Sequence, residues 1–144
     1  MLDWNQLDQP EHHAMLEDAK KMIAVRKREA DILALLPDQR RPHLIAVPYE
    51  GDIAVPVPYV RWNDRGAIIV AANRDPSQDA HLKLRIPLKE IGLAGHAQYR
   101  MTELWPEGKT ESVSEEELAG YTCTIKRDKT EGGGLRVLKI EPKP

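Results

Sequence analysis

The chain has 144 residues, of which 41% are hydrophobic and 31% are charged, and its formal net charge is -2 at pH 7. This length fits one domain, or one domain together with part of another. Charges of both signs are scattered along the chain, which argues against a nucleic-acid partner, because phosphate backbones select a concentrated basic face. The apolar runs are only a few residues long, so no segment is predicted to span a membrane. The cellular compartment stays open.

Residues 6–37 have the pattern of one long amphipathic helix. Asp8 can cap its start, Pro10 suits its first turn, and Pro37 ends it. Asp31 predicts a break or kink before the last apolar turn. Apolar residues recur between these points at three- and four-residue spacing, which predicts one apolar stripe. The stripe includes Met15, Ala19, Met22 and Ile23.

After residue 42 the pattern changes to short β-like runs separated by turn signals. The tetrapeptide Asn63-Asp64-Arg65-Gly66 is a good hairpin signal. Pro48, Pro56 and Pro58 predict an edge or an irregular crossing. The predicted fold is therefore mainly β: an antiparallel β-sandwich of about seven strands preceded by one long N-terminal helix. The predicted strands are 43–49, 59–63, 67–73, 82–88, 98–104, 121–126 and 135–140.

The chain thus divides into a helical segment, residues 1–37, and a sandwich domain, residues 43–144. Only a few residues, Pro37 to Pro42, separate the two. This connection is too short to act as a flexible linker, so we expect the helix to pack against the sandwich.

Several motifs along the chain occur in a recognisable order. Leu2-Asp3-Trp4 precedes the helix, and Met22-Ile23-Ala24-Val25-Arg26-Lys27 lies within it. The strands then contain Val60-Arg61-Trp62, Gly66–Asn73, Met101–Gly108 and Leu135–Pro142. In this order the chain resembles the C-terminal region of an α-amylase-type glycoside hydrolase (family 13), in which a (β/α)8 barrel is followed by an antiparallel β-sandwich.

This resemblance implies that residues 1–37 correspond to the last barrel helix and that Met15, Ala19, Met22 and Ile23 dock on the barrel. A barrel needs about 250 residues, so this chain cannot contain one, and we expect it to be an expressed fragment of a longer enzyme. The family's catalytic carboxylates lie on barrel strands, so no catalytic residue is assigned and no enzymatic activity is expected of the chain alone. The implied role is a non-catalytic accessory domain that stabilises the barrel. An uncovered stripe would favour a homodimer of the isolated fragment.

Two alternatives remain open. The chain could be a carbohydrate-binding module for α-glucan, because sugar rings stack on Trp and Tyr. Trp105 stands beside a turn, where it could be exposed, and Trp62 and Tyr59 could flank it only if the fold brings them together. The chain could also be an unrelated β-sandwich protein-interaction domain whose helix packs on its own sheet.

Metal and cofactor chemistry has little support in the sequence. Adjacent positions such as His12 and His13 point apart on a helix and do not form a metal site. The single cysteine, Cys123, lies in a predicted strand and is interpreted as a small buried apolar residue. The acidic run Glu115–Glu117 is interpreted as a solvated face or the start of a helix. No metal and no cofactor is predicted.

Overall fold

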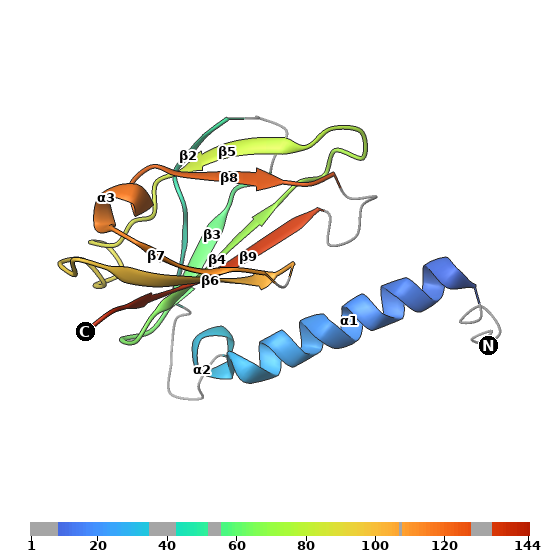
Figure 1. Cartoon of the computed structure of the whole chain (residues 1–144), viewed down its shortest axis with the longest axis horizontal. Coiled ribbons are helices and arrows are strands. Elements are labelled where there is room, and N and C mark those ends of the chain that lie inside the picture. The colour runs from blue at the N-terminus through green and yellow to red at the C-terminus, as the bar shows by residue number, and fades with distance from the viewer. Residues whose placement is uncertain (1–8, 35–42, 52–55, 107, 128–133) are drawn as a thin grey trace.

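The computed structural model of the chain describes residues 9–34, 43–51, 56–106, 108–127 and 134–144. Two antiparallel sheets face one another, and a long helix lies against the outer side of the larger sheet (Figure 1). The predicted class, a mainly β fold with one long N-terminal helix, is confirmed.

The larger sheet has six strands in the order β1-β3-β4-β9-β6-β7. The predicted hairpin joins β3 to β4, and the Asn63 side-chain oxygen accepts hydrogen bonds there from the backbone N–H groups of Arg65 and Gly66, at 2.9 and 3.1 Å. These bonds fix the tight turn and hence the register of the two strands. The strands are β1 (Leu44–Ala46), β3 (Tyr59–Trp62), β4 (Ala67–Ala72), β6 (Tyr99–Trp105), β7 (Thr110–Val113) and β9 (Leu135–Pro142).

The smaller sheet has three strands in the order β2-β5-β8, namely β2 (Tyr49–Gly51), β5 (Ala80–Leu84) and β8 (Tyr121–Ile125). Along β5 buried and exposed residues alternate strictly. This is the pattern of a strand that faces the core on one side and water on the other, because successive side chains point to opposite faces.

Every predicted strand segment contains a strand, but the described residues form nine strands where about seven were expected. The predicted segment 43–49 is split, because the chain leaves the larger sheet at Val47 and Pro48 and enters the smaller sheet as β2. The predicted segment 82–88 ends early, at Leu84. The strand β7 was missed because its sequence, Thr-Glu-Ser-Val, is mostly polar and three of its four residues are exposed.

A single helical turn, α3 (Glu115–Leu118), connects β7 to β8. Ser114 caps it: its hydroxyl oxygen accepts a hydrogen bond from the Glu117 N–H at 3.2 Å, and the Ser114 N–H donates to the Glu117 carboxylate at 2.7 Å. The Ser114 N–H and the Ser114 hydroxyl both donate to the Glu117 carboxylate, and these two bonds hold the pKa of that carboxyl below its usual value. The acidic run is therefore the start of a helix, and its Glu116 and Glu117 are also exposed to solvent, so both interpretations are confirmed. The turn places Leu118 in the core with no exposed surface.

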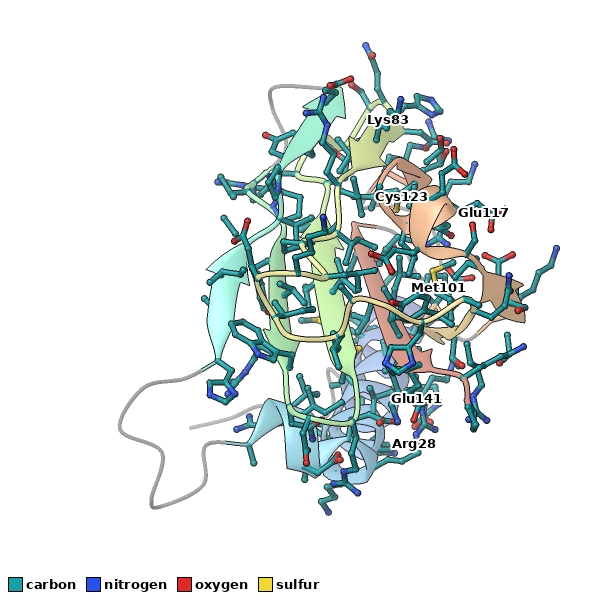
Figure 2. All side chains as sticks on the ribbon, turned by 90° about the vertical axis from the view of Figure 1, so that its left-hand side faces the viewer. Arg28, Lys83, Met101, Glu117, Cys123 and Glu141 are labelled. Carbon is teal, nitrogen blue, oxygen red and sulfur yellow. The ribbon has the colours of Figure 1, made fainter. Side chains whose placement is uncertain are left out.

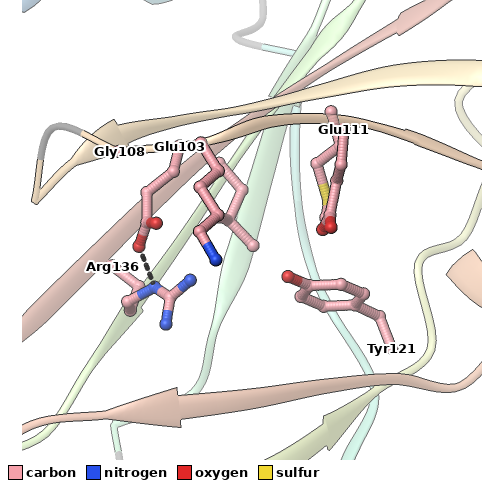
Figure 3. A pocket seen from close by; sticks show the side chains of 8 residues that line it. Glu103, Gly108, Glu111, Tyr121 and Arg136 are labelled. Carbon is pink, nitrogen blue, oxygen red and sulfur yellow. Dashed lines mark ion pairs between the residues drawn. The ribbon is translucent and has the colours of Figure 1, made fainter.

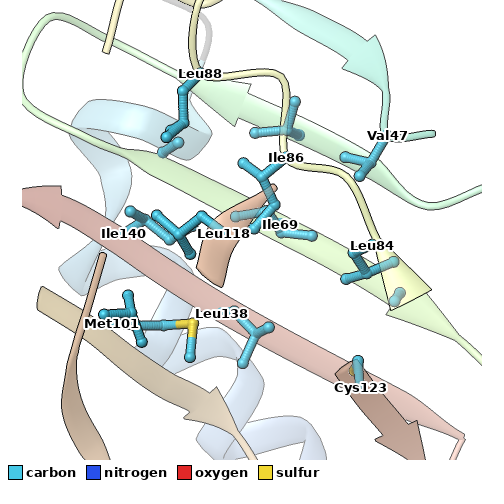
Figure 4. Close-up of a cluster of buried hydrophobic side chains, with 14 of the residues drawn as sticks. Val47, Ile69, Leu84, Ile86, Leu88, Met101, Leu118, Cys123, Leu138 and Ile140 are labelled. Atoms are coloured by element: carbon cyan, nitrogen blue, oxygen red, sulfur yellow. The ribbon is translucent and has the colours of Figure 1, made fainter. Parts of the chain in front are cut away.

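The main hydrophobic core lies between the two sheets (Figure 4). Met101 and Leu138 come from the larger sheet, Leu84 and Cys123 from the smaller one, and all four are at most 2% exposed. Burial raises the pKa of the Cys123 thiol, so the thiolate is disfavoured and the interpretation as a small buried apolar residue is confirmed. Figure 2 shows Met101 and Cys123 within the sandwich, with Arg28 and Glu141 at the end beside the helix.

Strand β4, with the sequence Ala-Ile-Ile-Val-Ala-Ala, is apolar along its whole length because both of its faces are covered. Ile69 and Ala71 belong to the core between the sheets, whereas Ile68 belongs to a second cluster on the outer face. A strand that shows no alternation therefore identifies a sheet that is buried on its second side as well. None of the described helices is long and apolar enough to cross a membrane.

Candidate functional site

The N-terminal helix consists of two parts, α1 (Pro10–Arg28) and α2 (Ala30–Leu33). Pro10 occupies the first turn as predicted, and Gln9 is the cap residue, with no side-chain hydrogen bond to the helix. The predicted cap, Asp8, lies outside the described residues. The break lies at Glu29, whose φ of -99° and ψ of 26° are not helical. The prediction of a break is therefore confirmed, although it occurs two residues before Asp31.

The C-terminal end of this helix packs on the outer face of the larger sheet. Val25 and Ile32, 8% and 4% exposed, form the second buried cluster with sheet residues. The expected packing of the helix against the sandwich is thus confirmed for this end. The sheet residues in the cluster are Ile68 of β4, Leu104 and Trp105 of β6, and Val137 of β9.

The helix break is also held by a buried ion pair. The carboxylate of Glu29, a residue only 4% exposed, lies 2.8 Å from Lys139 Nζ of β9 and accepts a hydrogen bond of 2.9 Å from Arg28 Nε. Lys139 also lies 3.2 Å from the Glu141 carboxylate. A buried charge is costly unless it is paired, so this pairing makes the position of the break relative to β9 specific.

The pKa values reflect this pairing. Burial by itself would raise the pKa of the Glu29 carboxyl, but hydrogen bonds from Lys139 and Arg28 outweigh burial and the pKa is lowered. For Lys139, burial would lower the pKa of the ammonium group, but the bonds to Glu29 and Glu141 raise it. Both groups are therefore charged at neutral pH.

A second, more exposed link lies beside the first. Arg65 in the β3–β4 turn donates a hydrogen bond of 2.7 Å from Nη2 to the Asp31 carboxylate, and Asn63 Nδ2 donates to the same carboxylate at 3.3 Å. The predicted kink residue Asp31 therefore anchors α2 to the hairpin that the sequence predicted.

The N-terminal part of α1 has a different environment, because it extends past the edge of the sandwich (Figure 1). Val25 is the only buried residue of α1. Met15 is 73% exposed and Ile23 is 54% exposed. Ala19 is also exposed, whereas Met22 is half-buried and packs against the second cluster. Of the four residues of the predicted docking stripe, three thus present their side chains to solvent and one contacts this chain's own sheet.

The predicted sugar-binding aromatics do not form one surface. Trp105 is 7% exposed, within the second cluster, so the expectation that it is exposed at a turn is wrong; the helix covers it. Trp62 is half-buried, packs on the core between the sheets and stacks on His43, with 5.1 Å between ring centroids. Tyr59 is 37% exposed and lies three residues before Trp62, on the opposite face of β3. Sugar binding through these residues stays a prediction.

Sequence reasoning missed the ion pair between Glu29 and Lys139, which holds the helix break. Glu29 stands in a run of charged residues, and nothing in the sequence distinguishes it from its exposed neighbours. Its partner lies on the last strand, so only the packing of α1 against β9 brings the two together. Among the described residues no group of three or more His, Cys, Asp or Glu side chains could hold a metal ion.

Compared with known proteins, the chain matches no protein-family model and no curated protein sequence.

Proposed function

We propose that this chain is a non-catalytic accessory domain of an α-amylase-type glycoside hydrolase, and that its helix packs on and stabilises a catalytic (β/α)8 barrel that this chain does not contain. The observation behind the proposal is the contrast along α1: one end is seated on the sandwich, and the other end presents apolar side chains to solvent. The fold itself, an antiparallel sandwich preceded by a helix, agrees with the order of elements that the resemblance implies.

The exposed stripe is the part of the surface best suited to a barrel. Isolated helices of this length are marginal in water, and an amphipathic helix gains most of its stability by burying its apolar face. Met15, Ala19 and Ile23 follow one another at four-residue spacing, so they lie on one side of α1. Burying Met15 and Ile23 would each contribute about 1.5–3 kcal/mol if their burial became complete. The last helix of a barrel presents such a face to the barrel strands.

A first experiment tests whether a barrel accompanies this domain. Antibodies raised against the chain would identify the native polypeptide in its source, and mass spectrometry would give that polypeptide's sequence. We expect a polypeptide with about 250 further residues that form a (β/α)8 barrel, together with activity on α-glucan. A native product of 144 residues would overturn the proposal.

A second experiment tests the docking face with a matched pair of substitutions. Ala19 and Ala24 are both exposed on α1, but five residues turn the helix by roughly 140°, so they lie on nearly opposite sides. Ala19→Lys should weaken binding of the chain to the separately expressed barrel by at least tenfold, about 1.4 kcal/mol. Ala24→Lys should leave the affinity nearly unchanged.

The pair also distinguishes the rival assignments. If the wild-type chain does not bind the barrel, or if both substitutions weaken binding equally, the stripe is not the docking face. Self-association abolished by Ala19→Lys, in the absence of barrel binding, would identify a second copy of the chain as the occupant. Met22→Lys is a poorer choice for this test, because Met22 also packs against the chain's own second cluster.

A further inference from the structure

A cavity of about 410 Å³ opens between the two sheets, on the side of the sandwich away from β1. Its walls come from β6, β7 and β9 of the larger sheet and from β8, an edge strand of the smaller one (Figure 3). The cavity has the volume of a pocket for a small ligand, for which about 300–1,000 Å³ is usual. The cavity and the helix lie on opposite faces of the larger sheet. A partner that binds α1 would therefore not cover the cavity.

Side chains two residues apart on a strand face the same side of the sheet, and this alternation places both apolar and charged side chains in the cavity. Met101 and Leu138 belong to the core between the sheets, and each forms part of the cavity wall. Glu103 and Arg136 each stand two residues away on the same strands, so they face the same side of the sheet. The β6–β7 hairpin adds Lys109 and Glu111 near the opening, where both are exposed. The cavity therefore has an apolar floor and a rim of charged groups.

Glu103 and Arg136 form a rigid pair in the wall. Arg136 Nε lies 2.6 Å from the Glu103 carboxylate, and the two side chains are 21% and 18% exposed. Arg136 Nη1 donates a hydrogen bond of 2.9 Å to the backbone carbonyl of Thr124 in β8, so the guanidinium links the two sheets. Only the second contact is a hydrogen bond, because the buried Nε atom has no hydrogen-bond partner and meets Glu103 as an ion pair alone. A group held from two sides in this way is pre-organised for a ligand.

At Gly108 the backbone of the β6–β7 hairpin passes close to the Glu103 side chain. A Cβ atom at position 108 would lie 2.4 Å from the Glu103 carboxylate oxygen and 3.0 Å from its carboxyl carbon. The backbone N–H of Gly108 also donates to the Glu103 carbonyl at 3.3 Å. A larger residue at this position would therefore require the Glu103 carboxylate to shift.

Tyr121 of β8 forms the opposite wall. Its hydroxyl points into the cavity, and the Glu111 carboxylate lies near the ring (Figure 3). Burial, together with the nearby Glu111 carboxylate, raises the pKa of Tyr121 to about 12. The phenol therefore keeps its proton at neutral pH and can donate a hydrogen bond, while its ring offers an apolar face.

We propose that this cavity between β6, β7, β8 and β9 binds a neutral sugar, a mono- or disaccharide. The four charged side chains of the lining, Glu103, Lys109, Glu111 and Arg136, sum to zero formal charge, so they do not select a charged ligand. They offer acceptors and donors side by side, which is what hydroxyl groups require, because each hydroxyl both donates and accepts. Tyr121 and the apolar floor suit the C–H faces of a sugar ring. This site goes beyond the proposed function and uses none of the aromatics that sequence reasoning selected.

The test is an NMR titration of the ¹⁵N-labelled whole chain with glucose, maltose and glucose 6-phosphate as probes. We expect saturable shifts with glucose or maltose, concentrated at the backbone amides of Lys109, Glu111, Tyr121 and Arg136. Glu111→Gln and Lys109→Ala should each raise the dissociation constant about tenfold, the effect of losing one hydrogen bond to a charged group. Both residues are exposed, so both variants should fold.

Glu116→Gln is the matched control, because Glu116 is an exposed acid on α3 that is not among the residues lining the cavity. It should leave the affinity unchanged. The proposal is overturned if neither neutral sugar gives a saturable shift, if only glucose 6-phosphate binds, or if the shifts gather around Tyr59 and Trp62. An equal effect of Glu116→Gln and Glu111→Gln would also overturn it. A negative result would not contradict the proposed docking on a barrel, because barrel binding is measured separately with the Ala19→Lys variant.

Discussion

The two ends of the N-terminal helix both mix apolar and charged residues, but their environments differ. From Val25 to Leu33 the chain contributes two buried apolar residues and one buried carboxylate, and each has partners on the larger sheet. Towards the N-terminus Met15 stands 73% exposed. Both ends contain apolar and charged residues at helical spacing. A periodic pattern therefore predicts that a helix has an apolar side, but does not tell which part of that side is covered by its own domain.

The two ends should differ most in how much a substitution changes the free energy of unfolding. Trp105→Ala removes the largest side chain beneath the seated end and should lower the free energy of unfolding by about 3–5 kcal/mol. Met15→Ala at the exposed end should change it by no more than about 0.5 kcal/mol. Urea unfolding of both variants measures this. A comparable loss from Met15→Ala would show that the N-terminal part belongs to this domain's own core.

A second comparison between the two ends uses the buried ion pair between Glu29 and Lys139. Glu29→Gln keeps the shape of the side chain but removes the charge that faces Lys139 and Arg28, and should cost about 1–3 kcal/mol. Lys139 keeps Glu141, 3.2 Å away, as a partner, which limits the loss. Glu17→Gln is the matched control: Glu17 pairs with Lys20 on the exposed part of α1 at 2.7 Å, and its substitution should leave the unfolding curve unchanged. Equal effects of the two substitutions would contradict the assigned role of the pair.

The same carboxylate should make stability depend on pH. The pKa of Glu29 is lower in the folded chain than its usual value of 4.5. A lowered pKa gives stability that is present above the unfolded value and is lost as the pH falls through the folded value. The advantage of the wild type over Glu29→Gln should therefore hold from pH 7 down to about 4.5 and shrink below it. Urea midpoints of both proteins at several pH values test this, and an advantage that grew on acidification would contradict it.

The exposed link at Asp31 should matter less. Asp31 and Arg65 are 40% and 70% exposed in their side chains, and exposed ion pairs contribute about 0.2–1 kcal/mol. Arg65→Gln should therefore cost no more than that, and the loss should decrease in high salt. Unfolding curves at low and high salt provide the measurement. A larger and salt-independent loss would mean that Arg65 packs α2 rather than pairing with its charge.

The smallest effect on stability is expected at the stripe itself. Ala19→Lys and Ala24→Lys should both lie within about 0.5 kcal/mol of the wild type, because both positions are exposed. Thermal unfolding of the isolated chain checks this, and the result is needed before a change in barrel affinity is attributed to the docking face. A clear destabilisation by Ala19→Lys alone would place that residue against the chain's own sheet.

Much of the fold was predictable because its signals are local. Alternating residues identified β5, the Asn-Asp-Arg-Gly turn identified the hairpin between β3 and β4, and the prolines identified the crossing from one sheet to the other. The strands β2 and β7 were missed because they are short, and β7 is polar as well, and their pairing with neighbours, not their composition, makes them strands. The same limit applied to Trp105, whose exposure depends on a helix far away in the sequence.

By itself the sequence determined the class of fold, the helix with its first turn and its break, and the faces of the alternating strands, because backbone conformation and side-chain period are set by near neighbours. Tertiary structure alone decided which part of the helix is covered, which tryptophan is buried, that Glu29 meets Lys139, and that Glu103, Glu111, Tyr121 and Arg136 line one cavity. These relations join residues from different strands and from a helix. They depend on register and on the packing of layers, and a short sequence window contains no information about either.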